Sequence, residues 1–402
     1  MELANRKIVL GLSGGVACYK AAELTRGLVK AGASVQVVMT DAATHFITPV
    51  TMQALSGHPV HTDQWDARIA NNMAHIDLTR GADAVVVAPC SADFLFKLAH
   101  GACDDLLSTL CLARPAGVPL MVAPAMNVEM WQNPATQRNV AQVRADGIRL
   151  LGPDAGAQAC GETGMGRMAE PEELLDMIIG AFQPQLLAGK RVLITAGPTF
   201  EPIDPVRGLT NLSSGKMGYA LARAARDAGA MVTLVSGPTA LTAPTGVQRI
   251  DVQTAREMHA AVLPQVAGQD VFIAVAAVAD WRVSNVSSQK LKKVASGGSQ
   301  SAPSAPALEF ALNPDILADV AALPDAPYCV GFAAESENLV QHGEDKRRRK
   351  NIPLLVGNIG HQTFGRDTNE LILFDAAGST SLAPASKIDL ARRLVAEIAR
   401  RL

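Results

Sequence analysis

Residues Lys190 to Gly218 read KRVLITAGPTFEPIDPVRGLTNLSSGKMG, and this stretch decides the fold because it repeats a pattern first seen from Lys7 to Gly32. In each copy a basic residue precedes a short apolar run, Ile8 to Leu10 or Val192 to Thr195, which predicts a β-strand. A glycine-rich turn follows each run. The same order of sequence signals therefore occurs twice in one polypeptide.

An Ala-rich helical pattern follows each turn, over Val16 to Ala31 and over Met217 to Ala228. Gly32 and Gly229 come next, where a left-handed helix cap is favoured. Each helix leads into another apolar strand, at Val35 to Met39 or Val232 to Val235. Strand, turn, helix and strand in this order predict the α/β class, with two Rossmann-like parallel-sheet domains in tandem.

Length and composition agree with two such domains. A chain of 402 residues is too long for one core of ordinary size, and we place the domains at residues 1–189 and 190–402. Apolar residues make up 48% and aromatic residues only 4%, as in parallel sheets covered by Ala-rich helices. A net charge of -2 does not attract the protein to nucleic acid or to anionic membranes, so we expect neither as a partner.

The cysteines and the apolar runs indicate a cytoplasmic location. The six cysteines include no CxxC pair and no zinc-ligand spacing, which favours reduced thiols. The first predicted strand begins within seven residues of the N-terminus, with no apolar signal segment before it. No apolar run reaches the roughly 20 residues that cross a bilayer.

Candidate ligand-binding residues follow the predicted strands of the first half. The turn Gly11-Leu12-Ser13-Gly14-Gly15 can direct backbone N–H groups at a phosphate, although a tight turn that only lets the helix pack is equally compatible. The turn does not match G-x-G-x-x-G, which argues against a simple NAD site. Thr40, Ser91 and Asn127 each follow the end of a predicted strand, where ligands bind in open parallel sheets.

Two further residues of this half can carry chemistry. His75 lies in a polar stretch before the strand at Ala84, where a surface or capping histidine is the ordinary alternative. Cys160 lies in a long glycine-rich loop, Gly152 to Met168, typical of a lid or binding segment. A free surface thiol on a disordered loop is the competing interpretation.

The first half resembles the flavin-dependent cysteine decarboxylase family, specifically the phosphopantothenoylcysteine decarboxylases, through GGVACYK, MAHIDL, PAMN and ACGETGMGRM. The resemblance implies a flavodoxin-like flavoprotein domain, and a homo-oligomer in which a neighbouring subunit completes the FMN site. It implies FMN binding by Gly11, Ser13, Gly14, Gly15, Thr40 and Ser91. It implies three catalytic residues, His75, Asn127 and Cys160.

These residue types suit that chemistry. Flavin can oxidise a substrate thiol to a thioaldehyde, which then accepts the electrons left when CO2 departs. The amide of Asn127 can orient the carboxylate, His75 can act as a base or polarise the substrate, and Cys160 can protonate the ene-thiolate.

The second half contains several phosphate-type signals. The segment NLSSGKMG, at Asn211 to Gly218, does not match the P-loop pattern. It does predict a helix N-terminus whose backbone N–H groups can face a phosphate. Asp280 ends a predicted buried strand, Asp270 to Ala279, where an acid can bind ribose or magnesium or merely cap a turn. A Ser-, Gly- and Pro-rich stretch at 294–307, after Lys290, predicts a mobile lid.

Two helical signals follow. Asn313 before Pro314 predicts an N-cap followed by proline at the first helical position. The basic run Lys346 to Lys350 precedes a predicted strand at Pro353 to Val356. Such a run is usually a solvated helix face, but its two lysines four residues apart share one side and could bind a triphosphate.

This half resembles the phosphopantothenate-cysteine ligases through AGPT, NLSSGKMG, SGP at Ser236, AAVAD, LKK, NPDI, GFAAE and the KxxxK pair. The resemblance implies a ligase domain that uses CTP with Mg2+ (or Mn2+), with Asp280 as metal ligand and Asn211 and Lys290 as catalytic residues. It implies that the nucleotide site comprises Ala274, Val275, Ala276, Asp280, Lys290, Asn313, Pro314, Asp315, Ile316, Phe332, Lys346 and Lys350.

Taken together, the two resemblances imply a bifunctional enzyme of coenzyme A biosynthesis. Its small-molecule substrates would be 4'-phosphopantothenate, cysteine and CTP. Two other hypotheses are a tandem Rossmann oxidoreductase that uses NAD, and a flavin-binding regulatory protein that has lost the chemistry. A yellow protein with flavin absorbance would favour the first hypothesis over the NAD enzyme.

Overall fold

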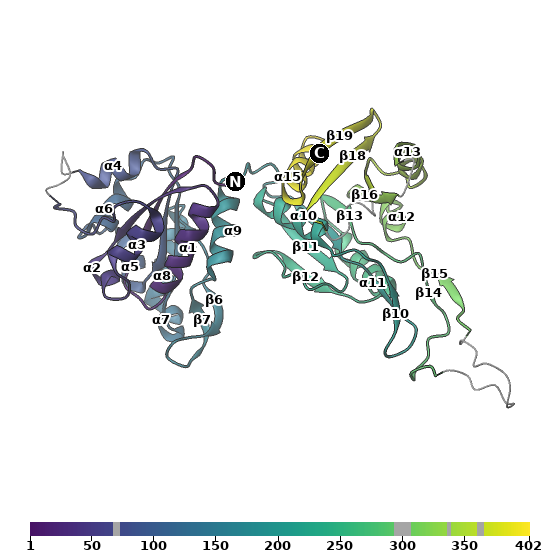
Figure 1. Ribbon diagram of the computed structural model, residues 1–402, viewed down its shortest axis with the longest axis horizontal. Helices are drawn as coiled ribbons and strands as arrows, with labels where there is room; N and C mark the ends of the chain where they lie inside the picture. Colours follow the sequence, from purple (N-terminus) through teal and green to yellow (C-terminus); the bar gives the residue numbers. More distant parts are fainter. Residues whose placement is uncertain (67–72, 293–306, 336–338, 360–365) are drawn as a thin grey trace. The chain divides into compact units, whose positions relative to one another are not determined.

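The computed structural model describes residues 1–66, 73–292, 307–335, 339–359 and 366–402. The chain forms two compact units, Met1–Phe182 and Gln183–Leu402, here called unit 1 and unit 2 (Figure 1). The loop predicted at 294–307 lies outside the described residues except for Ala307.

Unit 1 contains a five-stranded parallel sheet with the strand order β2-β1-β3-β4-β5. Its strands are β1 (Lys7–Leu12), β2 (Ser34–Met39), β3 (Ala84–Cys90), β4 (Leu120–Pro124) and β5 (Arg149–Leu150). A separate antiparallel hairpin consists of β6 (Asp154–Ala157) and β7 (Thr163–Arg167). Its helices are α1 (Cys18–Lys30), α2 (Asp41–Thr44), α3 (Pro49–Ser56), α4 (Ala74–Arg80), α5 (Ala92–His100), α6 (Leu106–Ala113), α7 (Val128–Gln132), α8 (Pro134–Ala145) and α9 (Pro171–Ala181).

Helices cover both faces of this sheet. Leu10 of β1 packs in one buried cluster with Leu24 of α1 and Ile178 of α9, and α1 and α9 lie side by side in Figure 1. Its neighbour Val9 packs on the other face with Leu95 of α5. Successive residues of a strand point to opposite faces, so continuous apolar runs such as Ile8 to Leu10 are what a doubly covered sheet requires.

Unit 2 contains an eight-stranded sheet with the strand order β12-β11-β8-β13-β16-β17-β18-β19. The strands from β12 to β17 are parallel, and β18 and β19 extend the sheet antiparallel. The strands are β8 (Arg191–Ala196), β11 (Met231–Ser236), β12 (Gln248–Asp251), β13 (Val271–Ala274), β16 (Tyr328–Glu335), β17 (Leu354–Ile359), β18 (Thr368–Asp375) and β19 (Gly378–Ser386). The helices are α10 (Lys216–Asp227), α11 (Ala255–Val266), α12 (Ile316–Ala321), α13 (Leu339–Arg349) and α15 (Lys387–Ala399).

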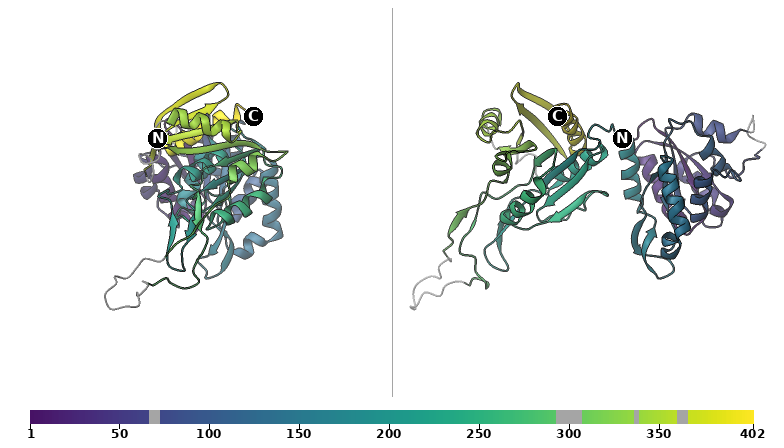
Figure 2. Two further views of the ribbon diagram at one scale, coloured as in Figure 1. Left: turned by 90° about the vertical axis from the view of Figure 1, so that its right-hand side faces the viewer. Right: turned by 180° about the vertical axis from the view of Figure 1, so that it is seen from behind.

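Two short ribbons accompany this sheet. One pairs β9 (Phe200–Pro202) with β10 (Gly208–Thr210), and the other pairs β14 (Trp281–Val283) with β15 (Phe310–Leu312). The second ribbon forms an arm that extends away from the large sheet (Figure 2). On the large sheet, Leu221 of α10 and Leu394 of α15 cover one face, and Met258 of α11 and Leu317 of α12 cover the other. The predicted α/β class is confirmed, but only the sheet of unit 1 is wholly parallel, because β18 and β19 make the sheet of unit 2 mixed.

Helices α1 and α10, which follow the first strand of unit 1 and of unit 2, end in the same way. Gly32 has φ +100° and Gly229 has φ +91°, which are the left-handed conformations predicted for them. Gly32 N–H donates to Val29 O at 2.9 Å, and the following N–H donates to Leu28 O at 3.0 Å. Two equivalent bonds follow α10. Both helices therefore end in a Schellman motif, which satisfies their last carbonyl groups.

Two predictions about local structure were wrong. The strand predicted at Asp270 to Ala279 ends at Ala274, because beyond it only an isolated parallel bridge, between Ala277 and Pro198, continues the pairing. The N-cap of α12 is Asp315 rather than Asn313, since the Asp315 side chain accepts the helical N–H of Ala318 at 3.1 Å. Asn313 instead donates its side-chain amide to Ala279 O at 2.9 Å.

No helix within the described ranges combines the length and the apolarity that crossing a membrane requires.

Candidate functional site

The carboxyl ends of β2, β3 and β4 each continue into a helix through a polar N-cap, namely Thr40, Ser91 or Asn127. Each side-chain oxygen accepts the backbone N–H three residues later, at 3.2, 3.1 and 3.0 Å. A hydroxyl that accepts such a bond retains its hydrogen, which it can donate to a ligand. The structure thus brings these predicted residues to one edge of the sheet in unit 1, as N-caps.

The four predicted residues of the first turn differ in their surroundings. Ser13 is buried, and its hydroxyl donates to Pro89 O at 2.9 Å and accepts from Ser91 N at 2.8 Å. A Cβ on Gly11 would lie 2.4 Å from the Leu107 side chain, and one on Gly14 would lie 2.6 Å from Ala42 Cβ. A Cβ on Gly15 would meet nothing within 4 Å. Gly15, just before α1, is therefore the glycine with room for a ligand.

This difference predicts opposite outcomes for two alanine variants. Gly11→Ala should lower the free energy of unfolding by about 1–3 kcal/mol, because its methyl group overpacks against Leu107. Gly15→Ala should change that energy by less than about 0.5 kcal/mol, but it should weaken flavin retention. Denaturant unfolding of the flavin-free protein and fluorescence titration with FMN would measure the two effects. Equal unfolding energies for both variants would contradict this assignment.

Asn127 and Cys160 lie on either side of one carboxylate, that of Glu162. Cys160 Sγ donates to Glu162 Oε2 at 3.3 Å, and Asn127 Nδ2 donates to the same oxygen at 3.4 Å and to Glu129 Oε2 at 2.8 Å. The β6–β7 hairpin presents this loop to α7, where Gln158 Oε1 accepts the N–H of Val128 at 2.9 Å. The structure therefore unites two of the three predicted catalytic residues.

The hairpin approaches α7 closely because two of its residues are glycines. A Cβ on Gly164 would lie 2.6 Å from Val128 Cγ2, and one on Gly166 would lie 2.6 Å from Met126 O. Gly166 also has φ +123°, a conformation that side chains disfavour. The glycines of the Cys160 loop thus place the thiol beside Asn127.

His75 and Glu162 show the limits of the sequence patterns. His75 is a half-buried residue of α4, and within the described residues no hydrogen bond joins it to Asn127 or Cys160. Its role stays a prediction. Glu162 was missed, and the signal that could have revealed it is a carboxylate two residues after a candidate catalytic thiol.

The cysteines separate into core and surface residues. All six are free; Cys103 and Cys160 are exposed, and the other four are buried. Burial raises the pKa of Cys18 to about 11, and burial also raises the pKa of Cys90. Core packing thus accounts for the buried thiols, and Cys160 remains accessible for chemistry.

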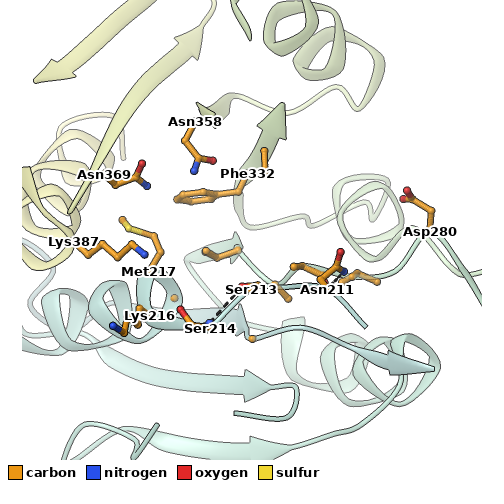
Figure 3. A pocket seen from close by; sticks show the side chains of 18 of the residues that line it. Asn211, Ser213, Ser214, Lys216, Met217, Asp280, Phe332, Asn358, Asn369 and Lys387 are labelled. Atoms are coloured by element: carbon orange, nitrogen blue, oxygen red, sulfur yellow. Dashed lines mark hydrogen bonds between the residues drawn. The ribbon is translucent and has the colours of Figure 1, made fainter. Parts of the chain in front are cut away.

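In unit 2 the candidate site consists of two cavities that share a wall. The larger, about 420 Å³, contains the start of α10 (Figure 3), and the smaller, about 330 Å³, contains the start of α12. The shared wall consists of Ala276, Val278, Asp280, Phe332 and Lys346. The continuous surface offers space for two neighbouring ligands.

Nearly all predicted nucleotide-site residues gather here. The smaller cavity is lined by Ala274, Ala276, Asp280, Asn313, Pro314, Asp315, Ile316, Phe332, Lys346 and Lys350. Val275 and Asn211 line the larger cavity. Lys290 lines neither cavity and is exposed, so its contact with a nucleotide stays a prediction.

The end of the basic run is held against the α12 start. Lys350 Nζ forms an ion pair with Asp315 Oδ1 at 2.8 Å. Burial is the largest single influence and acts to raise the pKa of Asp315, but the hydrogen bonds from Lys350 and from the N–H of Ala318, with the charges of Lys350 and Lys346, together outweigh it, and the net shift is downward. Asp315 therefore stays ionised, and it positions Lys350 at the smaller cavity.

Two amide side chains fix the irregular segment after β13. Asn211 Nδ2 donates to Ala277 O at 2.8 Å, and Asn313 Nδ2 donates to Ala279 O at 2.9 Å. Asn313 N–H also donates to Asp280 O at 2.9 Å. Regular pairing ends at Ala274, and the segment that follows, held by an isolated bridge between Ala277 and Pro198, forms part of the cavity wall.

Six polar residues that line the larger cavity were missed as site residues: Ser213, Ser214, Lys216, Asn358, Asn369 and Lys387. The first three lie in a recognisable motif, NLSSGKMG. The other three belong to β17, β18 and α15, whose local sequences carry no ligand-binding signal. Strand pairing places Asn358 beside β16 and Asn369 beyond β17, and α15 then begins at Lys387 directly after β19.

The shared wall offers one carboxylate as a metal ligand, that of Asp280. Among the described residues no group of three or more His, Cys, Asp or Glu side chains could hold an ion. Mg2+ commonly uses one or two carboxylates together with substrate phosphates and water. The residues therefore fit a cation that arrives with a nucleotide.

Comparisons with known proteins cover both units. A family model described as Flavoprotein matches residues 1–183, and one described as DNA/pantothenate metabolism flavoprotein C-terminal domain matches residues 187–402. The Coenzyme A biosynthesis bifunctional protein CoaBC of Vibrio cholerae is 50% identical over 394 residues, covering 97% of each chain. That of Escherichia coli is 47% identical over 406 residues, covering 100% of this chain and 98% of the relative. A crystal structure of the C-terminal domain of a protein of this name is 37% identical and covers 54% of this chain and 97% of its own, with a TM-score of 0.45.

Proposed function

This chain belongs to the family of coenzyme A biosynthesis bifunctional proteins CoaBC, and on that premise we propose how its two units divide the family's two activities. Unit 1 decarboxylates 4'-phosphopantothenoylcysteine to 4'-phosphopantetheine with FMN. Unit 2 makes 4'-phosphopantothenoylcysteine from 4'-phosphopantothenate and cysteine, with CTP and a divalent cation. The observation that carries this division is the match of separate flavoprotein and pantothenate-metabolism families to the two halves.

FMN fits the sheet edge of unit 1. The hydroxyls of Thr40 and Ser91 can donate to it, and Gly15 leaves open space at the start of α1. When bound, FMN would supply reversible two-electron oxidation of the substrate thiol. The oxidised sulfur group can then accept the electron pair that remains when CO2 departs.

The protein's own residues orient the decarboxylation substrate and move its protons. Asn127 donates to the substrate carboxylate in place of its present bond to Glu162. Cys160 gives its proton to the carbon that has lost CO2. Glu162, which accepts a hydrogen bond from both residues, holds the thiol in position until then. His75 acts as base or polarises the substrate, and a neighbouring subunit of a homo-oligomer completes this site.

In unit 2 the smaller cavity receives the nucleotide and the larger cavity receives the acid. The carboxylate of 4'-phosphopantothenate attacks the α-phosphate of CTP, so that an acyl-cytidylate forms and pyrophosphate leaves. Lys346 and Lys350, with a cation at Asp280, stabilise the developing charge. The amine of cysteine then displaces CMP near Asn211.

A single incubation tests the proposal. The purified protein with 4'-phosphopantothenate, cysteine, CTP and Mg2+ should yield the coupled product and then its decarboxylated form, both followed by mass spectrometry. The protein should also show flavin absorbance. A colourless protein that leaves CTP unconsumed would reject the proposal. The family relationship gives no support to an NAD oxidoreductase or to a regulatory protein without chemistry.

A further inference from the structure

The hairpin that carries Cys160 is a separate two-stranded sheet, because within the described ranges β6 and β7 pair with each other and with no other strand. Its strands are in register from Asp154 and Arg167 at the base to Ala157 and Thr163 near the tip. A two-stranded hairpin alone is at best marginally stable in water. The position of the Cys160 thiol therefore depends on contacts between the hairpin and the rest of unit 1.

The base of this hairpin is held at the start of α9. At the end of β7, Arg167 Nη2 donates to Glu170 Oε1. At the start of β6, the carboxyl group of Asp154 forms a side-chain hydrogen bond with that of Glu173. Glu173 Oε2 also accepts the backbone N–H of Glu170 at 3.1 Å. Two glutamates at the start of one helix thus hold both strands.

Glu170 also joins the hairpin to α1. The same oxygen, Glu170 Oε1, accepts from Lys20 Nζ at 3.1 Å, and Lys20 Nζ donates to Met168 O at 2.7 Å. Lys20 is only 4% exposed. A buried ammonium group is costly unless a negative charge accompanies it. The Glu170 carboxylate therefore stabilises Lys20 in the core and, through Arg167, fixes the end of β7 against it.

We propose that Glu170 is a positioning residue for proton transfer in unit 1: by holding Lys20 and Arg167, it fixes the hairpin so that Cys160 reaches the carbon that has lost CO2. This inference rests on the proposed decarboxylation. Glu170 acts through the position of the thiol and does not contact the substrate.

The other attachments of the hairpin lie on its α7 side. Met126 N–H donates to Gly166 O at 2.9 Å, and Val128 N–H donates to Gln158 Oε1 at 2.9 Å. Without the Glu170 carboxylate, β7 is held mainly from that side, and the hairpin can tilt. Proton transfer requires the donor within hydrogen-bond reach, and a misplacement of about 1 Å can cost about 10²-fold in rate.

A displaced thiol affects one step more than the others. Asn127, which orients the substrate carboxylate, belongs to the start of α7 and not to the hairpin. Loss of CO2 precedes the proton transfer from Cys160. A substrate that has lost CO2 but has not received this proton remains two hydrogens short of 4'-phosphopantetheine. The ratio of this oxidised product to 4'-phosphopantetheine therefore reports the position of the thiol, whereas a general structural defect lowers both products together.

Glu170→Gln tests the proposal, because it removes the charge with little change in shape. In a single turnover without oxygen, the ratio of oxidised product to 4'-phosphopantetheine should rise about 10- to 100-fold over the wild type. Mass spectrometry would measure both products, and flavin absorbance after gel filtration should show that FMN is retained. Glu170→Asp keeps the charge and should restore part of the wild-type ratio. Glu172→Gln changes an exposed glutamate in the next turn position of α9 and should leave the ratio unchanged.

Two further variants keep the test decisive. Arg167→Met, at a side chain that is 39% exposed, should raise the ratio in the same direction even if Glu170→Gln does not fold. In the Cys160→Ala background, Glu170→Gln should cause no further rise, because the thiol that it positions is gone. An unchanged ratio in Arg167→Met and in any folded Glu170→Gln protein, an equal fall of both products, or additive effects in the double variant would overturn the inference. Absence of CO2 release by the wild type would instead reject the decarboxylase function.

Discussion

Cys160→Ala should retain FMN but lower the formation of 4'-phosphopantetheine about 10²- to 10⁴-fold, the usual contribution of a general acid. The thiol is exposed on the loop of the β6–β7 hairpin, and within the described residues its side-chain hydrogen bonds go to Gln158 and Glu162 rather than to Thr40 or Ser91. Its removal therefore leaves the hydroxyls of those last two residues intact. Flavin absorbance after gel filtration would measure retention, and mass spectrometry would measure product.

Cys103→Ala is the matched control for this variant. Cys103 is the other exposed thiol, and it lies in a different loop after α5. It should keep normal product formation. Normal phosphopantetheine output from Cys160→Ala would reject the proposed role of the thiol, and loss of FMN would show that the loop acts in binding instead.

Asn211→Asp should still form acyl-cytidylate but transfer it to cysteine about 10- to 100-fold more slowly, the cost of an unmade polar contact. Asn211 donates to Ala277 O at 2.8 Å, and a carboxylate cannot donate to that carbonyl group. The backbone at Ala277 should therefore move, and it lines the cavity in which the amine attacks. Asp280 and Lys350 remain in place for activation of the carboxylate.

Separate assays of the two half-reactions would measure this difference. Pyrophosphate release without cysteine reports formation of acyl-cytidylate, and CMP release after addition of cysteine reports transfer. Asn285→Asp offers a control, because Asn285 accepts the N–H of Glu309 at 3.1 Å near the arm and lines neither cavity. Equal slowing of both half-reactions by Asn211→Asp would contradict the proposed role.

The repeated strands and helices could be predicted because their signals are local. The continuous apolar run Ile8 to Leu10 and the glycines after α1 and α10 are patterns that depend on a few neighbouring residues. The strand predicted to end at Ala279 failed because apolar residues suit a cavity wall as well as a sheet. Local pattern cannot distinguish these two environments.

The candidate site was predictable where residues lie at strand ends or in motifs. Asp280, Phe332 and Lys350 were found in this way. Lys387 and Asn369 were not found, because each lies in an ordinary amphipathic helix or strand that reaches the cavity only through tertiary packing or strand pairing between distant parts of the sequence. Glu162 was missed for a different reason, since its role depends on where a flexible-looking loop folds back.

The irregular segment after β13 has a pharmacological consequence. Ala276 and Ala277 line the larger cavity with small side chains, and the carbonyl group of Ala277 is already held by Asn211. An inhibitor that bound this part of the wall would rely chiefly on backbone shape. A resistance mutation that placed a bulkier side chain at position 276 would also narrow the space that both substrates share. Such a resistant enzyme should therefore be less active.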